Sequence, residues 1–311
     1  MSALSRREFV RVSGLSLLGA LGGLGLPAVR AAGPVGRTGA PRLRVSLAAF
    51  SFRRYYKDSN RGKKKQVDPS RQIDLFNFID YCADHGCDAE LTSYYFPAAA
   101  GPAEMAKIRR HAFLRGVAVS GSSVGNNFTA TDPAALREEI AGVKRWIDLC
   151  AILGAPHIRV FAGEATGIDE AQARRLVVAS LEECCDYAGA RGITLGLENH
   201  HGLVAEPDGL LAIVRAVRSP WLGVNLDTGN FQTDDPYRDL AAVAPYAVNV
   251  QLKVGVLRRG AKAEEPTDLE RVVKILHEAN YQGYVALEYQ NSQPWEEVPL
   301  WLARMKAVFA R

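Results

Sequence analysis

Four polar side chains stand in or at the end of short apolar runs in the second half of the chain. Glu198 ends "LGLE", Asp227 ends "GVNLD", Gln251 lies in "VNVQLKV" and Glu288 ends "VALE". Three carboxylates brought together would repel one another and lose much of their hydration. A divalent cation removes both costs, and all-oxygen ligation suits Mg²⁺ or Mn²⁺, with Co²⁺ as a further candidate, better than a structural zinc.

Each of these residues also has a simpler interpretation when it is considered alone. An acid at the end of a strand is usually a helix cap or a solvated loop residue. Asp227 could cap the turn "DTGN", and Glu288 could pair with a lysine. Four such residues on consecutive strands and in the same phase favour a metal site over four unrelated caps.

The elements that position these residues follow from the alternation of apolar runs and helical patterns after Leu43. Helical patterns with apolar residues at three- and four-residue spacing cover 71–86, 133–154, 171–192, 268–283 and 295–311. Eight candidate strands cover 42–52, 87–96, 117–124, 156–163, 193–199, 222–230, 247–254 and 284–291. This alternation predicts parallel strands with crossover helices.

Eight strand–helix units of about 34 residues each over residues 43–311 predict a single-domain α/β protein, a closed (β/α)₈ TIM barrel. The alternative is an open doubly wound sheet, but no G-x-G-x-x-G motif follows the first strand. In a barrel the carboxyl ends of all strands meet on one face, where barrel enzymes do their chemistry. We therefore expect Glu198, Asp227, Gln251 and Glu288 to lie close together.

Two basic residues on these strands are candidates for contact with a substrate. Lys253 lies two residues after Gln251 and shares its inward phase, so that it could polarise a substrate oxygen or form a salt bridge with a carboxylate. Arg159, in "HIRVFAG", could point into the barrel mouth near Glu198. Burial with a carboxylate partner is an equal alternative for Arg159.

The loop after Glu198 carries His200 and His201. His200 could touch the substrate or orient a ligand, whereas His201 is expected to be a loop residue. The long basic segment 53–66 follows the first strand on the same face. It could hold an anionic group or act as a lid, but a solvated loop is the simpler interpretation.

The motifs "LGLENHHG", "LGVNLDTGN", "VNVQLKV" and "VALEY" resemble the metal-binding strand ends of the sugar phosphate isomerase/epimerase family, the xylose isomerase-like TIM barrels. The resemblance covers essentially the whole chain after residue 31. It implies that Glu198, Asp227, Gln251 and Glu288 are the ligands of one divalent cation, Mn²⁺ or Mg²⁺. The third ligand is more often histidine in this family, and glutamine occurs in its hydroxypyruvate isomerase branch.

The resemblance also implies a reaction. A metal that chelates a carbonyl oxygen and the adjacent hydroxyl acidifies the carbon between them. Glu198 and Glu288 would then remove and return a proton through an enediolate, as the two catalytic residues. Return to the same carbon from the other face gives epimerisation, return to the neighbouring carbon gives isomerisation, and loss of a β-substituent gives elimination. The expected partner is a small carbohydrate.

Two residues differ from the sequence pattern of the ketose 3-epimerases, and these differences narrow the range of expected substrates. Asn230 in "DTGN" takes the place of a histidine that contacts the substrate there, and Val204 replaces a second glutamate. These differences argue against epimerisation of free ketohexoses, and they leave Asn230 as a substrate-binding candidate. The endonuclease IV branch needs several more histidine ligands than this chain provides near its strand ends.

Two alternatives to an isomerase or epimerase remain open. One is a lyase, hydrolase or dehydratase of 3-keto-glycosides that uses the same metal site, because an exported protein rarely meets sugar phosphates. The other is a carbohydrate-binding barrel without turnover. The presence of both Glu198 and Glu288 argues against binding alone, since binding does not need two flanking carboxylates.

Residues 1–31 have the pattern of a twin-arginine export signal. Arg6 and Arg7 precede an uncharged Gly/Leu-rich run, and "VRAA" offers a cleavage point after Ala31. A membrane anchor is the alternative, but the run is near the minimum length for spanning and is diluted by glycine. We therefore expect a linker over 32–42, a barrel over 43–311, a periplasmic location and no stable membrane insertion after cleavage.

Charge and cysteine content exclude other classes. Four arginines and one glutamate fall within residues 1–31, so that the net charge is +1 for the rest of the chain and +4 for the whole. Nucleic acid is therefore not an expected partner. The five cysteines include no C-x-x-C pair and are expected to be buried and free, although a Cys82–Cys87 disulfide is left open. A homo-oligomer is left open as well.

Overall fold

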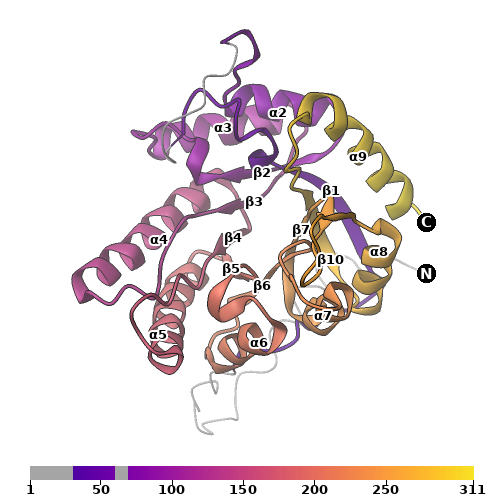
Figure 1. Cartoon of the computed structure of the whole chain (residues 1–311). Helices are drawn as coiled ribbons and strands as arrows, with labels where there is room; N and C mark the ends of the chain where they lie inside the picture. The colour runs from indigo at the N-terminus through magenta and orange to yellow at the C-terminus, as the bar shows by residue number, and fades with distance from the viewer. Residues whose placement is uncertain (1–30, 60–68) are drawn as a thin grey trace, which may run out of the picture.

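Eight parallel strands close on themselves in the order β1-β10-β7-β6-β5-β4-β3-β2 and form a barrel surrounded by helices (Figure 1). The computed structural model describes residues 31–59 and 69–311. The barrel strands are β1 (Arg42–Ala48), β2 (Asp88–Thr92), β3 (Val119–Ser123), β4 (His157–Val160), β5 (Thr194–Glu198), β6 (Leu222–Asp227), β7 (Ala247–Leu252) and β10 (Gln282–Leu287). The predicted (β/α)₈ barrel is confirmed, and the closed strand order excludes the open doubly wound sheet.

Helices connect the strands and cover the outside of the barrel (Figure 1). They are α2 (Leu75–Asp84), α3 (Pro102–Leu114), α4 (Pro133–Leu153), α5 (Glu170–Gly189), α6 (Pro207–Ala216), α7 (Pro236–Val243), α8 (Leu269–Glu278) and α9 (Pro294–Phe309). The sequence patterns predicted five of them and missed α3, α6 and α7. The latter two are short, with ten and eight residues, and α3 is exposed over much of its length. α3 buries few of its residues, which leaves a weak periodic signal, whereas α6 and α7 have clear apolar faces that the sequence analysis missed.

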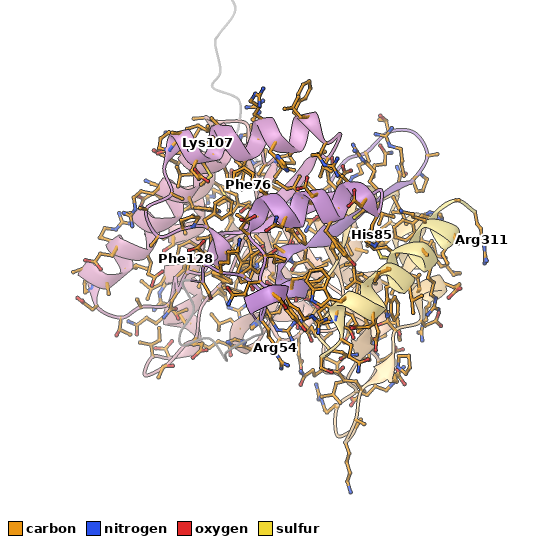
Figure 2. The ribbon with its side chains drawn as sticks, turned by 90° about the horizontal axis from the view of Figure 1, so that it is seen from above. Arg54, Phe76, His85, Lys107, Phe128 and Arg311 are labelled. Atoms are coloured by element: carbon orange, nitrogen blue, oxygen red, sulfur yellow. The ribbon has the colours of Figure 1, made fainter. Side chains whose placement is uncertain are left out.

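The ends of the helices follow local chemistry. The side chain of Asp132 accepts hydrogen bonds from the backbone of Ala134 and Ala135 at the start of α4, and Gly154 adopts a left-handed conformation after its last turn (φ 87°). On the outside of the barrel, Phe76 of α2 packs edge-on against the ring of His111 of α3 at 5.3 Å. Figure 2 labels Phe76 on α2 and Lys107 on the neighbouring helix α3.

Residues 32–41 lie against the base of the barrel. The backbone N–H of Ala32 donates to the carbonyl of Val217, and that of Val35 donates to the carbonyl of Pro245. Arg37 donates to the carbonyl of Ala247 at the start of β7. The segment expected as a linker thus has fixed contacts at the end of the barrel opposite the carboxyl ends of the strands.

Several predictions concern segments or contacts outside the barrel strands. The expected export signal covers residues 1–31, of which residues 1–30 lie outside the described residues, as do residues 60–68 of the basic segment. Within the part of the chain that the structure describes, no helix is both long and apolar enough to cross a bilayer. All five cysteines are buried and free, so that Cys82 and Cys87 form no disulfide.

A small antiparallel ribbon follows β7 and has no counterpart in the sequence prediction. It consists of β8 (Gly255–Val256) and β9 (Glu265–Pro266). Two-residue strands leave no periodic signal. The ribbon lies between β7 and α8, on the face where the strands end.

Candidate active site

The four residues expected to be metal ligands stand at the carboxyl ends of four neighbouring strands. Glu198 ends β5, Asp227 ends β6, Gln251 lies near the end of β7, and Glu288 directly follows β10. The strand order β10-β7-β6-β5 makes these elements neighbours in the barrel wall. All four side chains are buried, with Asp227 fully buried and Glu288 the most exposed at 7%.

The ammonium of Lys253 lies among these acids. Its Nζ is 3.2 Å from Oδ2 of Asp227 and 3.6 Å from Oε1 of Glu288. It also donates a hydrogen bond of 2.8 Å to Oδ1 of Asn230. Of the two roles considered for Lys253, the structure contains the salt bridge, and the lysine pairs with two carboxylates from different strands.

A second cation holds the remaining carboxylate of the mouth. Nε of Arg159 lies 2.8 Å from Oε2 of Glu198, and both side chains are buried. The guanidinium of Arg159 donates to the carbonyl of Val124 at 2.9 Å and lies 4.0 Å from the centre of the Phe161 ring. Nδ2 of Asn230 donates to the other oxygen of Glu198 at 2.9 Å. One oxygen of Glu198 therefore accepts a hydrogen bond, whereas the other faces Arg159 in an ion pair and has no hydrogen-bond partner among the described residues.

The side chain of Gln251 points into the barrel interior. Its carbonyl oxygen accepts a hydrogen bond of 2.7 Å from Asn225, and its amide nitrogen donates to Oε1 of Glu90 at 2.7 Å. Asn249 completes this layer, because its amide donates to Glu90 at 2.9 Å and to Asn225 at 2.8 Å. The layer lies one step deeper in the barrel than the cations of the mouth.

Sequence reasoning did not identify Glu90, Asn225 or Asn249, although each left a signal. Asn225 and Asn249 precede Asp227 and Gln251 by two residues, and alternate residues of a strand share a face. Glu90 is a charged residue in the middle of β2, between the apolar residues Ala89 and Leu91. A period-two reading carried one step back from Asp227 and Gln251 would have found Asn225 and Asn249, but not Glu90.

Burial dominates the acid–base properties of the site. It raises the pKa of Glu198 to about 7, with Arg159 opposing the shift, and that of Asp227 to about 8, with Lys253 opposing it. The pKa of Glu90 also rises to about 7 through burial. Burial lowers the pKa of Lys253, but the surrounding carboxylates outweigh this and hold it above its ordinary value. The cations therefore stay charged among acids that exchange protons near neutral pH.

These contacts test whether the residues fit a divalent cation. Asp227 and Glu198 already face cations, and both polar atoms of the Gln251 amide are engaged inside the barrel. Among residues 31–59 and 69–311, no group of three or more His, Cys, Asp or Glu side chains is arranged to hold a metal ion. As folded, the four expected ligands therefore do not present a four-oxygen coordination shell.

The strand ends are fixed to one another by backbone contacts. Asn199 exchanges two hydrogen bonds with the backbone of Asp227, at 2.9 Å and 2.8 Å. The N–H of Lys253 donates to Oγ1 of Thr228 at 3.0 Å. The carboxylate of Asp227 accepts from the N–H of Gly229 at 2.9 Å. The contacts of Asn199 and Thr228 position β5, β6 and β7 relative to one another without using the charged groups of the mouth.

His200 and His201 lie on the rim rather than at the acids. The ring of His200 packs edge-on against Phe161 at 4.8 Å, and Nε2 of the exposed His201 lies 3.1 Å from Glu164. Two hollows flank this histidine loop. The larger, about 390 Å³, is bounded by the loops after β3, β4 and β5, and the smaller, about 300 Å³, reaches Asn230. Both histidines line both hollows, so that a small molecule at the rim would meet them.

The family follows from the sequence as a whole. The sequence profile of the xylose isomerase-like TIM barrel family matches residues 79–305, which includes the strand ends of the mouth. The chain belongs to the xylose isomerase-like TIM barrel family. No curated protein matches it in sequence.

Solved structures share the fold at low sequence identity. One is D-psicose 3-epimerase from Clostridium cellulolyticum H10 with D-tagatose, at TM-score 0.69 and 15% identity, covering 86% of this chain and 99% of that one. A xylose isomerase domain protein from Planctomyces limnophilus gives TM-score 0.65 at 15% identity, with coverages of 88% and 99%. L-ribulose 3-epimerase gives 0.65 at 18%, with coverages of 86% and 92%. These likenesses establish the shared barrel.

Proposed function

We propose that this protein is an isomerase or epimerase that acts on a sugar or sugar derivative by proton transfer next to a carbonyl. The observation that carries the proposal is the pair of buried carboxylates, Glu198 and Glu288, at the carboxyl ends of β5 and β10, with a cation held between the strands that bear them. Similarity to two sugar 3-epimerases in the same fold family supports this reaction class.

The chemistry needs one base, one acid and a positive group. One carboxylate takes the proton from the carbon beside the carbonyl, and the electron pair moves onto the carbonyl oxygen as an enediolate. The other glutamate, which enters the step protonated, gives its proton to the opposite face of that carbon, which epimerises it. If the proton goes to the neighbouring carbon instead, and the proton of the hydroxyl on that carbon passes to the former carbonyl oxygen, the sugar is isomerised. A positive group near the oxygen stabilises the developing charge.

The positive group could be a bound divalent cation or a cationic side chain of the protein. The sequence predicts Mn²⁺ or Mg²⁺ on Glu198, Asp227, Gln251 and Glu288, and this stays a prediction. A bound divalent cation would supply Lewis-acid polarisation of the carbonyl. The four side chains, in the arrangement they have in the structure, do not form a coordination shell for that ion. The proton transfers between the glutamates and the substrate do not require it.

A lyase or hydrolase of 3-keto-glycosides is the second candidate, and the larger hollow favours it. Phe161 and His200 bound this space of about 390 Å³ beside the mouth, which is room for a group attached to the reacting sugar. Proton removal by the same carboxylates, followed by loss of the attached group from the β-carbon, would give elimination. A free monosaccharide needs no such space.

The test is incorporation of solvent deuterium at a substrate carbon. A panel of ketoses and 3-keto-glycosides is incubated with the full chain in D₂O and followed by NMR. We expect exchange with at least one sugar, and its loss in Glu288→Gln and Glu198→Gln. Glu104→Gln, on α3 outside the barrel, serves as the matched control and should exchange as the wild type does. Saturable sugar binding without exchange would instead establish a carbohydrate-binding barrel.

We also propose that residues 1–31 direct export through the twin-arginine route. The support is the Arg6–Arg7 pair before the uncharged run. Replacing both arginines with lysine should retain a reporter fused to residues 1–31 in the cytoplasm, whereas the unaltered segment should export it. Equal export of both fusions would contradict the proposal.

A further inference from the structure

The side chain of Lys253 is buried, and its ammonium contacts two carboxylates and an amide of the site. We propose that its ammonium occupies the position of the divalent cation in this barrel, so that the site works with a resident cation and excludes the metal. The inference deepens the proposed function and rests on it for the chemistry, but not for the binding test below.

The first support is the set of atoms around Nζ. It meets Oδ2 of Asp227 from β6, Oε1 of Glu288 after β10, and Oδ1 of Asn230 from the loop after β6, at 3.2 Å, 3.6 Å and 2.8 Å. Of these three acceptors, Asn230 takes a hydrogen bond and the two carboxylate oxygens form ion pairs, so that N–H groups of the ammonium remain for a substrate oxygen. Two of these acceptors belong to the carboxylates expected to bind the metal.

The second support is the space that the chain leaves for the lysine stem. A Cβ at Gly229 would lie 2.8 Å from Cδ and 2.9 Å from Cβ of Lys253, closer than such atoms approach. The carbonyl of Lys253 accepts a hydrogen bond of 2.6 Å from Thr267, and its N–H is held by Thr228. The absence of a side chain at position 229 thus lets a fixed lysine cross the mouth.

The third support is the incompatibility of the two cations. Mg²⁺ needs its oxygen ligands at about 2.0–2.1 Å, and Ca²⁺ needs them at about 2.3–2.6 Å. An ion at that distance from Asp227 and Glu288 would lie within a few ångströms of the ammonium, where like charges repel strongly in a buried site. Gln251 is not free to bind the ion, because both polar atoms of its amide form hydrogen bonds with Asn225 and Glu90.

The charge count agrees. Three carboxylates of the mouth, Glu198, Asp227 and Glu288, face two buried cations, Lys253 and Arg159. With one glutamate protonated to act as the acid, the two remaining carboxylate charges balance the two cations. In the reaction the unprotonated glutamate takes the C–H proton, the electron pair moves to the carbonyl oxygen, and an N–H of Lys253 donates to that oxygen. The second glutamate, which enters the step protonated, gives its proton to the carbon, so that the two glutamates exchange protonation states and no co-reactant is consumed.

The test measures Mn²⁺ binding to the full chain by loss of the free-ion signal in electron paramagnetic resonance. We expect no binding to the wild type at 100 μM Mn²⁺, in keeping with a dissociation constant above about 1 mM. Lys253→Met keeps the stem, removes the charge and should bind one Mn²⁺ at least about tenfold more tightly. Lys253→Arg, which keeps the charge, should not. The exposed Lys107→Met is the matched control and should behave as the wild type does.

Stoichiometric Mn²⁺ binding by the wild type overturns the proposal, whatever the variants do and even if Lys253→Met fails to fold. The deuterium-exchange assay separates this outcome from failure of the proposed function. Exchange that occurs only with added Mn²⁺ would disprove the resident cation and leave the isomerase reaction standing. If the wild type excludes Mn²⁺ and exchanges deuterium with no sugar, the resident cation stands and the isomerase reaction is disproved.

Discussion

The side-chain amide of Gln251 donates to the carboxylate of Glu90 at 2.7 Å, across the barrel interior and 161 residues away in sequence. With the bond from Asn225 to its carbonyl oxygen, both polar atoms of this amide are satisfied below the mouth. Gln251 is therefore part of a hydrogen-bonded layer that lies inside the barrel, below the charged groups of the mouth. This is a structural role distinct from the ligand role that its position in the sequence implies.

Replacing Gln251 with leucine should destabilise the protein by roughly 1–3 kcal/mol, because the buried Glu90 and Asn225 would each lose a hydrogen-bond partner. Urea unfolding followed by circular dichroism measures the difference. The exposed Gln172→Leu on α5 provides the matched control and should change stability by less than about 0.5 kcal/mol. If the two variants unfold alike, Gln251 is not engaged inside the barrel.

Arg159 and Glu198 make a second testable pair, because their ion pair is buried. Arg159→Leu leaves a buried carboxylate without its cation and should cost roughly 3–5 kcal/mol. Removing the charge of Glu198 as well, in Arg159→Leu/Glu198→Gln, should recover a large part of this loss. A double-mutant cycle from urea unfolding gives the coupling energy. A coupling near zero would mean that the two side chains do not interact in solution.

The fold could be predicted because its signals are local and repeated. Runs such as "LGVNLD" on β6, which is buried throughout, are what a parallel strand covered on both sides requires. Their regular alternation with helical patterns fixes the topology. The ribbon of β8 and β9 could not be predicted, since two-residue strands carry no period.

The site could be predicted only in part. The phase of each strand correctly indicates which residues stand at the mouth, because side chains alternate across a strand. The phase of a strand does not determine the direction in which a long side chain at the mouth extends. Gln251 turns inward to Glu90, whereas Lys253, two residues later, reaches across to Asp227 and Glu288. Those choices depend on partners far away in sequence, which one strand's pattern cannot contain.

Gly121 in β3 makes room for the ring of His157 in the neighbouring strand. A Cβ at Gly121 would lie 1.8 Å from Cε1 of that ring, which is itself buried. Gly121→Ala should therefore destabilise the protein by about 1–3 kcal/mol through overpacking. Gly142→Ala, within α4, is the matched control, because its new Cβ meets nothing closer than 3.7 Å. That substitution should stabilise the helix by about 0.5–1 kcal/mol. Equal effects in thermal unfolding would contradict the proposed contact.

His157 should make stability depend on pH. Burial lowers the pKa of its imidazole to about 4, against 6.5 for an ordinary histidine, although one ring nitrogen lies 3.1 Å from the carbonyl of Ser120. Between these two values the unfolded chain binds a proton that the folded chain does not. The histidine therefore contributes a loss of stability as the pH falls from 6.5 towards 4, of up to about 3 kcal/mol.

Comparison with His157→Gln isolates this contribution, since glutamine can still donate to the Ser120 carbonyl but does not titrate. Buried acids such as Glu90, with raised pKa values, act in the opposite direction over part of this range, because they favour the folded state as the pH falls. They are common to both proteins and cancel in the difference. Urea unfolding at pH 7.5, 5.5 and 4.5 should show the wild type losing stability relative to the variant as the pH falls. The exposed His277→Gln should follow the wild type at every pH, and a constant difference between wild type and His157→Gln would show that His157 does not titrate as a buried group.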